Sequence, residues 1–331
     1  MVAECALPVH SFAVRTSLLS AATVAAAVAL HGDRIGLGDR HPMVGIAALR
    51  PYLTAATAAA AALLAPRRPV PAAVLAGLAA AAAPPLVRRI GAGPGVLEHP
   101  DDLVVLAANV WHGRARPVAF AALLERERPD LVALSEAGQP FLDLLRPHLA
   151  PLGYRSWTSA APGAHDGDGV ALLAGPRAGD LTVTGGPELR TRHLRANGGI
   201  LGERSLVVAH TAAPTTVAGT RAWRHDLAAL ARWSHEPVAP IIAGDLNATL
   251  DHALLRAVLG PVVSASTGSG RGLVGTFPTP LRPNWPALIG IHIDHVLVPA
   301  GSAVPRYAIV DVPGSDHRAV LARVRTPEAS R

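Results

Sequence analysis

Ile241-Ile242-Ala243-Gly244-Asp245-Leu246-Asn247 is a short apolar run that ends at a glycine and then presents a carboxylate and a carboxamide two residues apart. A run of this length is typical of a buried strand, and Gly244 marks a plausible end for it. Residues two apart on extended backbone point the same way, so Asp245 and Asn247 are expected to project together from the strand's carboxyl end. The same residues also fit an ordinary polar turn, so other segments decide between a turn and a site.

The composition indicates a membrane portion joined to a soluble one. The 331 residues are 50% hydrophobic and 16% charged, with a mean hydropathy of +0.30. Residues 1–99 carry 8 Arg and 4 acidic residues, whereas residues 100–331 carry 22 Arg and 20 acidic residues. The second part is nearly neutral and lacks the basic excess of a non-specific footprint on duplex DNA. Cys5 is the only cysteine, which excludes an intramolecular disulfide and a cysteine-based metal cluster.

Three apolar stretches predict a membrane region with about three transmembrane helices. They cover residues 12–30, 43–65 and 70–87, and a helix needs about 20 mainly apolar residues to cross a bilayer. Arg50-Pro51 interrupts the second stretch. A soluble, Ala-rich helical hairpin is the alternative, and a cleaved signal peptide over the first stretch is another.

Charges in and beside these stretches predict the orientation of the chain in the membrane. Arg15 lies near the start of the first stretch and Arg67-Arg68 lies between the second and third, so the positive-inside tendency places both in the cytoplasm and everything after Val87 outside the cell membrane. Arg88-Arg89 after the third stretch opposes this orientation. A glycine-rich linker follows, which gives a membrane region at 1–90, a linker at 91–100, a folded domain at 101–325 and a tail at 326–331.

Short apolar runs and amphipathic helical stretches alternate in the folded domain. Strands are predicted at 103–108, 131–134, 169–174, 205–209, 291–298, 307–310 and 319–324, and helices at 118–127, 141–149, 220–235 and 252–259. In the helix at 220–235, Trp223, Leu227, Leu230 and Trp233 are spaced for one apolar face. The order of these elements indicates α/β layers with mixed sheets.

A polar residue follows six of the apolar runs. These residues are Asn109, Glu136, His210, Asp245 with Asn247, Asp294, and Asp316 with His317. In layered α/β folds, strand ends and the loops after them commonly form the functional site. The recurrence therefore favours a shared site over six unrelated turns.

Six segments around these residues resemble the endonuclease/exonuclease/phosphatase superfamily, which includes pancreatic deoxyribonuclease, apurinic endonucleases, neutral sphingomyelinases and inositol-polyphosphate 5-phosphatases. The segments are LAANVWHG, PDLVALSEAG, LVVAHTAAP, IIAGDLNAT, IHIDHVLV and GSDHRAVLARV. The resemblance covers roughly residues 101–325. It implies a four-layered α/β sandwich of two packed mixed β-sheets flanked by helices, here preceded by an α-helical transmembrane region, and metal-dependent hydrolysis of phosphate esters.

The resemblance also implies roles for the residues in the matching positions. Glu136 is expected to ligate Mg²⁺ or Mn²⁺, with Asn109 and Asp316 at or near the metal, and hard oxygen ligands suit these ions. Asp245 is expected to orient and deprotonate the attacking water, and Asn247 to position the water or the phosphoryl group.

Two histidines complete the implied site. His317, supported by Asp294, is expected to bind one phosphoryl oxygen, and His210 another oxygen or the leaving group. Further candidates for contacts with substrate, which no motif assigns, are His112, Arg114, His292, His165, Asp166 and Asp168.

The sequence therefore favours a membrane-anchored, Mg²⁺-dependent phosphoesterase with its catalytic domain outside the cell membrane. A nuclease acting on DNA or RNA and a hydrolase of lipid or small phosphoesters both stay open within that class. A non-catalytic, membrane-tethered binding module with the same fold is the alternative from another class. A transport protein is disfavoured because most of the chain is soluble in character.

Overall fold

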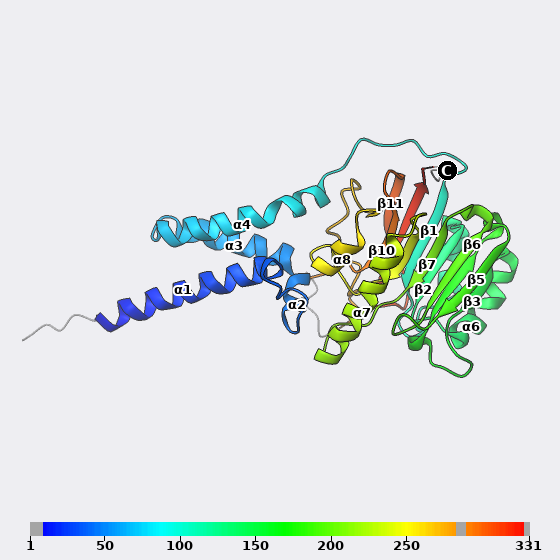
Figure 1. The fold of residues 1–331 in the computed structure, drawn as a ribbon, viewed down its shortest axis with the longest axis horizontal. Coiled ribbons are helices and arrows are strands. Elements are labelled where there is room, and N and C mark those ends of the chain that lie inside the picture. The colour runs from blue at the N-terminus through cyan, green and yellow to red at the C-terminus, as the bar shows by residue number, and fades with distance from the viewer. Residues whose placement is uncertain (1–8, 283–288, 328–331) are drawn as a thin grey trace, which may run out of the picture.

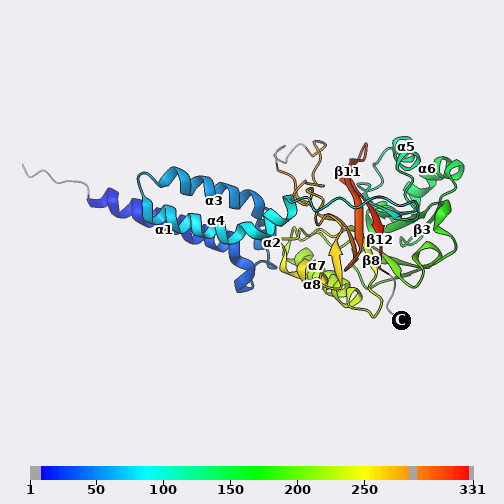
Figure 2. The same cartoon turned by 90° about the horizontal axis from the view of Figure 1, so that it is seen from above.

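The computed structural model describes residues 9–282 and 289–327, which form a layered body and a bundle of helices that projects from it (Figure 1). The same division is visible from above, where α1, α3 and α4 run side by side away from the body (Figure 2). The body holds every strand of the two sheets, and the bundle is entirely helical.

Two mixed sheets of six strands each make up the centre of the body, and each sheet has one parallel pair near its middle. The first sheet, in spatial order, contains β11 (Ala303–Asp311), β12 (Arg318–Arg325), β1 (Leu103–Asn109), β2 (Leu131–Ser135), β4 (Val170–Ala174) and β3 (Arg155–Thr158). The second contains β5 (Leu181–Gly186), β6 (His193–Gly198), β7 (Ser205–Ala209), β8 (Ile241–Asp245), β10 (Asp294–Pro299) and β9 (Val262–Ser264).

The central strands are apolar on both faces because both faces are covered. On β1, Val105 and Ala107 belong to the core between the two sheets, whereas Val104 and Leu106 belong to the core under the outer helices. This is the alternation that a pleated strand imposes. The result is four layers, with a helical layer outside each sheet.

Amphipathic helices cover the outer faces of both sheets. The first sheet carries α5 (Pro117–Glu127) and α6 (Gln139–Leu149), and the second carries α7 (Val217–Ser234) and α8 (Ala253–Val258). Trp223, Leu227 and Leu230 of α7 are fully buried against the second sheet, as their helical spacing predicts. The predicted four-layered α/β sandwich is thus confirmed.

The predicted strands of the body all correspond to observed ones, and four strands were not predicted. β3, β5 and β9 form edges of the two sheets, and β6 lies next to an edge. Edge strands are buried on one side only or are short; β3 has no fully buried residue. They therefore lack the continuous apolar run that marks a central strand.

The helical bundle differs in one respect from the three predicted spans. It contains α1 (Val9–His31), α2 (Met43–Ala48), α3 (Arg50–Leu64) and α4 (Pro69–Ile90). The second predicted span is broken at Leu49, directly before Arg50-Pro51, which leaves α3 with only 15 residues. Within the part of the chain that is described, one helix, α4, is long and apolar enough to cross a membrane by length and composition.

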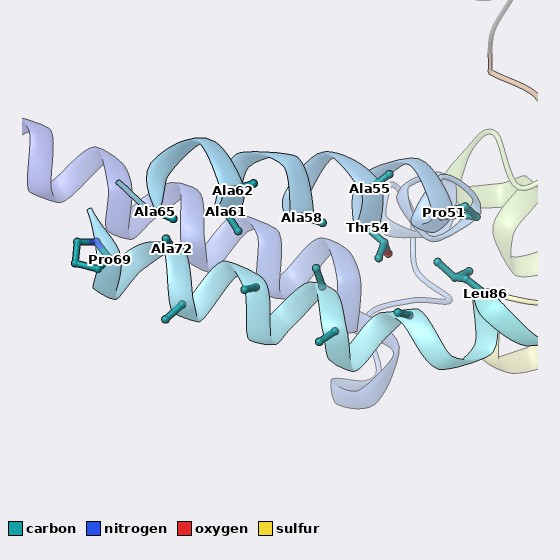
Figure 3. Close-up of a pocket in the computed structure, with 15 residues that line it drawn as sticks. Pro51, Thr54, Ala55, Ala58, Ala61, Ala62, Ala65, Pro69, Ala72 and Leu86 are labelled. Atoms are coloured by element: carbon teal, nitrogen blue, oxygen red, sulfur yellow. The ribbon is translucent and has the colours of Figure 1, made fainter. Parts of the chain in front are cut away.

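An apolar groove of about 770 Å³ lies between α3 and α4. Figure 3 shows small side chains lining it from both helices, with Pro51 and Leu86 at the end nearest the body. Small side chains permit close approach of helices. In this bundle the side chains that face the groove are mostly alanine, which leaves the groove unfilled.

Charged pairs attach the bundle to the body. Arg89 of α4 donates two hydrogen bonds to the carboxylate of Asp251, at 2.6 and 3.1 Å, and Asp251 is 1% exposed. Arg50 forms an ion pair with Asp33 at 2.8 Å and lies 3.9 Å from Asp251. Buried charges are stable only when paired, so these contacts hold the bundle in one position on the body.

The predicted linker is also attached to the body. Gly93 donates a backbone hydrogen bond to the carbonyl of Gly268 at 2.7 Å, and Ala92 and Ser269 form an isolated bridge. The first residues of the predicted linker at 91–100 therefore contact the body. Residues 328–331 of the predicted tail lie outside the described residues.

Candidate active site

The chain direction in both sheets brings the predicted polar residues to one edge. β1 and β2 are parallel, as are β7 and β8, so the carboxyl ends of each pair lie at the same edge of their sheet. β12 is antiparallel to β1 and β10 is antiparallel to β8, so both begin at that edge. The four strand ends and two strand starts carry the residues predicted from sequence: Asn109, Glu136, His210, Asp245, Asp294 and His317.

Gly244 allows β8 to end with Asp245 at this edge. Its φ is 141°, and an added Cβ would lie 1.9 Å from the carbonyl oxygen of Ala209 on the neighbouring strand. Only glycine fits such a close approach with positive φ. The close packing of β7 against β8 therefore requires glycine at position 244, directly before Asp245.

Asp245 lies at the centre of the cluster and is 2% exposed. Its Oδ1 accepts a hydrogen bond from the backbone N–H of Asn247 at 2.8 Å, and its Oδ2 accepts one from Nδ2 of Asn109 at 3.0 Å. The Nε2 atoms of His210 and His317 each lie 3.8 Å from Oδ2. Residues from both sheets thus converge on a single carboxylate.

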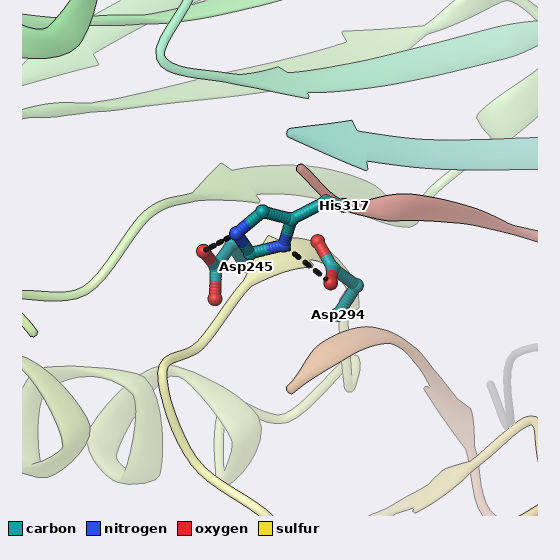
Figure 4. Close-up of side chains that lie close together, drawn as sticks. All are labelled: Asp245, Asp294 and His317. Atoms are coloured by element: carbon teal, nitrogen blue, oxygen red, sulfur yellow. Dashed lines mark hydrogen bonds and ion pairs between the residues drawn. The ribbon is translucent and has the colours of Figure 1, made fainter. Parts of the chain in front are cut away.

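His317 lies between two aspartates, as Figure 4 shows. Its Nδ1 is 2.9 Å from Oδ2 of Asp294, and its Nε2 faces Asp245. Asp294 pairs directly with Asp245 across the β8–β10 ladder. Ligand atoms of these three residues lie within 4.8 Å of one another, close enough to hold one metal ion.

The environment divides these groups into a base and an acid. Burial raises the pKa of Asp245 to about 6, and the Asp294 carboxylate acts in the same direction, against the imidazoles of His317 and His210. Burial lowers the pKa of His317, but the carboxylates of Asp294 and Asp245 outweigh it and raise the pKa to about 9. At neutral pH, Asp245 can therefore accept a proton while His317 is protonated.

Asn109 connects Asp245 to Glu136. Its Nδ2 also donates to Oε1 of Glu136 at 2.9 Å, and Oε2 of Glu136 accepts a hydrogen bond from the backbone of His112 at 2.8 Å. Burial raises the pKa of the Glu136 carboxyl, but the imidazole of His210 and the hydrogen bond from Asn109 outweigh it, so the pKa is below its ordinary value. The Glu136 carboxyl is consequently ionised at neutral pH.

His210 and Asp316 each have one buried side-chain atom without a hydrogen-bond partner. His210 is 8% exposed, and its Nδ1 has no hydrogen-bond partner. The Oδ2 of Asp316 is ion-paired with Nε of Arg282, and its Oδ1 is buried without a partner. Asp316 is thus not among the residues in contact with Asp245, and its assignment as a metal ligand stays a prediction.

Several site residues adopt a backbone conformation that side chains disfavour. Trp111, His112, Glu136 and Asn247 have φ between 45° and 57°, in the left-handed region. Such conformations are retained where the surrounding structure requires them, commonly at functional sites. Here they turn the chain sharply after β1, β2 and β8 and aim the side chains at the common edge.

The unassigned candidates from the sequence divide into two groups. His112 stays at the site, with its Nδ1 3.3 Å from Glu136. Asp166 instead accepts the backbone N–H groups of Gly138 and Phe141 at the start of α6. His292 is buried and hydrogen-bonded to Tyr307 and to the carbonyl of Val274.

Sequence reasoning missed the residues that support the site. Ser315 donates to the carbonyl of Asn109 at 2.7 Å and accepts from the backbone N–H of His317 at 3.0 Å. Thr276 accepts the backbone N–H of Asp294 at 3.2 Å. Phe277 packs its ring on that of His317, with centroids 4.7 Å apart. Of these three residues, only Ser315 could have been found from the sequence, because it directly precedes Asp316-His317. Thr276 and Phe277 lie in a loop without periodicity.

Comparison with known proteins identifies a family and similar folds. Residues 106–317 match the Endonuclease/Exonuclease/phosphatase family. No curated protein matches the chain. Among solved structures, TDP2 of D. rerio complexed with a single-strand DNA product is similar at 15% identity and a TM-score of 0.54, covering 68% of this chain and 99% of the other. An endonuclease/exonuclease/phosphatase from Beutenbergia cavernae is similar at 18% identity and a TM-score of 0.52, covering 69% and 72%.

The fold is a four-layered α/β sandwich with the polar residues gathered at one edge of its two sheets. The chain belongs to the endonuclease/exonuclease/phosphatase family, since the match covers more than half of its length and all six predicted strand-end segments except the last residues of the final one. Members of this superfamily are phosphoric ester hydrolases and generally depend on a divalent metal.

Removal of the negative charge at Asp294 tests the electrostatics of the site. In Asp294→Asn the imidazolium of His317 loses its principal stabilising charge, so we expect the pKa of His317 to fall from about 9 by about 1 to 3 pH units. Histidine NMR titration measures this directly. Asp143→Asn, a change at a half-exposed carboxylate on α6, is the matched control. An unchanged titration of His317 in Asp294→Asn would contradict the assigned pairing.

Proposed function

We propose that the chain is a membrane-anchored phosphoric ester hydrolase in which water attacks the phosphorus of a phosphomonoester or phosphodiester. The convergence of Asn109, His210, Asn247 and His317 on the buried carboxylate of Asp245 is the observation that carries this proposal. A carboxylate with a pKa of about 6 is suited to accept a proton near neutral pH.

Each polar group has a role that its contacts support. Asp245 accepts the proton of the attacking water, and Asn247, fixed by its hydrogen bond to the carbonyl of Thr211 at 2.9 Å, positions the water or the phosphoryl group. Protonated His317, oriented by Asp294, donates to a phosphoryl oxygen. His210 donates to another oxygen or to the leaving group as the phosphorus–oxygen bond breaks.

The donor set fits a divalent cation. Glu136 is ionised, Asp245 and Asp294 lie nearby, and the buried Oδ1 atoms of Asp294 and Asp316 have no hydrogen-bond partner. Glu136, with Asn109 and Asp316, would hold Mg²⁺ or Mn²⁺, because these ions prefer oxygen ligands. When bound, such an ion supplies positive charge that stabilises the phosphoryl oxygens. His317 is already engaged with Asp294, which favours its role as a donor over one as a ligand.

The domain arrangement supports an anchor at residues 1–90 and a catalytic domain at 101–325. α4 has the length and composition of a membrane span, and α1 and α3 run beside it (Figure 2). The turn with Arg67-Arg68 lies at the end of the bundle away from the body (Figure 1). If these arginines stay in the cytoplasm, the body lies on the outer side of the cell membrane.

A nuclease is the second candidate within the same reaction class. Trp111 lies at the site with the guanidinium groups of Arg114 and Arg282 at 4.6 and 5.4 Å from its ring centroid, a combination that can stack bases and bind phosphate groups. The near-neutral charge of the domain is less favourable to nucleic acid. A non-catalytic binding module has no observation in its favour, because each implied catalytic side chain is present at the edge.

Substitution of the proposed base tests the reaction. In Asp245→Asn the amide cannot accept a proton, so we expect kcat on 4-nitrophenyl phosphate or bis(4-nitrophenyl) phosphate with Mg²⁺ to fall about 10²- to 10⁴-fold. Asp180→Asn, at a fully exposed carboxylate, should leave kcat within about twofold. EDTA should abolish the activity and added Mg²⁺ or Mn²⁺ restore it.

Retention of activity by Asp245→Asn would refute the assigned base. Absence of activity in the unaltered chain on both esters and on single-stranded DNA or RNA would favour the binding module. Cleavage of DNA or RNA alone would favour the nuclease.

Labelling from outside intact cells tests the membrane orientation. We expect Asp180→Cys in a Cys5→Ser background to react with a membrane-impermeant maleimide, because residue 180 is exposed on the body. The Cys5→Ser chain alone is the unlabelled control. Labelling that occurs only after permeabilisation would place the catalytic domain in the cytoplasm, and recovery of the chain in the soluble fraction would refute the anchor.

A further inference from the structure

A cavity of about 350 Å³ lies between α2 and the end of β8, directly beside the proposed catalytic groups. Its size is within the range of small-molecule sites. Asn247 lines it from the catalytic side, Val44 and Ala48 line it from α2, and Leu49 lines it directly after that helix. The cavity therefore joins the catalytic edge to the base of the helical bundle.

Two wall residues connect the cavity to the reacting groups. Asn247 donates its backbone N–H to the Asp245 carboxylate at 2.8 Å. The ring of Phe277, another wall residue, packs on the imidazole of His317 with centroids 4.7 Å apart. A molecule with its phosphoryl group at Asp245 and His317 would thus have its neighbouring atoms at the entrance of this cavity.

The cavity is chemically suited to hydrocarbon. Among the described residues that line it, none is Arg, Asp or Glu, and most are aliphatic, proline or phenylalanine. A second phosphate group or a nucleic-acid backbone is bound mainly by arginine or lysine, and neither lines this wall, where the basic side chains are His41 and His252. Apolar groups gain free energy when they leave water for such a surface.

The wall formed by α2 is held in place and lies outside the segment shared with the family, which begins at residue 106. The Nε2 of His252 is 2.8 Å from the carbonyl of Val44, and Val44 is 1% exposed within the core of the body. A fixed wall can select a substrate by shape. It is thus a feature of this chain's own amino-terminal region.

The apolar groove of the bundle reaches the same place. Leu49 and Ala48 line the cavity, and Pro51, two residues further on, lines the groove between α3 and α4. A smaller cavity lies between the two. Ala48 and Ile291 line both this smaller cavity and the cavity beside the site, and Pro51 and Ala55 line both the smaller cavity and the groove. Cavities that share lining residues therefore run from the groove to the catalytic edge, and the smaller one between them is also lined by the ion-paired Arg89 and Asp251.

We propose that this cavity is the subsite for the hydrocarbon part of the substrate, and that the substrate is an amphiphilic phosphoester with acyl or alkyl chains. The inference rests on the proposed phosphoesterase function and adds the substrate class. The phosphoryl group occupies the polar edge at Asp245, Asn247 and His317, and the first part of a chain lies between α2 and Phe277.

Matched substrate pairs test the subsite in the full-length protein in detergent micelles with Mg²⁺. The pairs are phosphatidic acid with glycerol 3-phosphate, and phosphatidylglycerol with glycerophosphoglycerol. Each pair shares its phosphoester and differs only in acyl chains. We expect kcat/KM to be at least about tenfold higher for the acylated member of the pair that is cleaved.

Gly45→Trp narrows the cavity from α2. Gly45 lines it, and an added Cβ there would meet no atom within 4 Å. Loss of contact with about two methylene groups corresponds to about tenfold in affinity, so the acylated-to-deacylated ratio of kcat/KM should fall about tenfold. Gly77→Trp on α4, where an added Cβ also meets nothing within 4 Å, is the matched control and should keep the ratio.

Several outcomes would overturn the subsite. The first is an equal kcat/KM for both members of a pair. The second is an acylated-to-deacylated ratio of kcat/KM that Gly45→Trp leaves unchanged, and the third is one that Gly77→Trp lowers as much as Gly45→Trp does.

Ala48→Phe is a second variant that fills the cavity from the next turn of α2. It should lower the ratio of kcat/KM as Gly45→Trp does, and it replaces Gly45→Trp if that variant does not fold. Hydrolysis of nitrophenyl esters without hydrolysis of any acylated member overturns the subsite and leaves the phosphoesterase function intact. Failure on every phosphoester refutes both.

Discussion

The burial of one carboxylate, that of Asp245, is the constraint on which the site depends. A buried carboxylate is costly unless it is hydrogen-bonded or paired. Here hydrogen bonds from the backbone of Asn247 and the side chain of Asn109 satisfy it, and two imidazoles lie 3.8 Å away. These partners come from β1, β7, β8 and the start of β12, so both sheets must pack together before the carboxylate can be accommodated.

The fold supplies this convergence through strand direction. Because the parallel pairs end at the same edge at which β10 and β12 begin, six residues far apart in the sequence meet without a long loop. The sequence shows this arrangement because central strands are apolar on both faces and end abruptly in a polar residue. Asn109, His210, Asp245, Asp294 and His317 could therefore be predicted, and the structure brings them together.

Other features depend on contacts between distant segments, which one sequence does not reveal. The edge strands β3 and β5 carry weak patterns because much of their surface faces solvent, and β9 carries one because it has only three residues. The pairing of Asp316 with Arg282 and the packing of Phe277 on His317 involve a loop without periodicity. The docking of α2 and Arg89 onto the body likewise gives no local signal, and it changes the amino-terminal region from a simple tether into part of the wall beside the site.

Hydrolysis in H₂¹⁸O tests the central claim most directly, because it reports which bond the water attacks. With bis(4-nitrophenyl) phosphate as substrate, attack on phosphorus places one ¹⁸O atom in the 4-nitrophenyl phosphate product and none in 4-nitrophenol, as mass spectrometry of both products would show. Activation of water by Asp245 for attack on phosphorus predicts this result. Label in the nitrophenol, or a product without ¹⁸O, would contradict it.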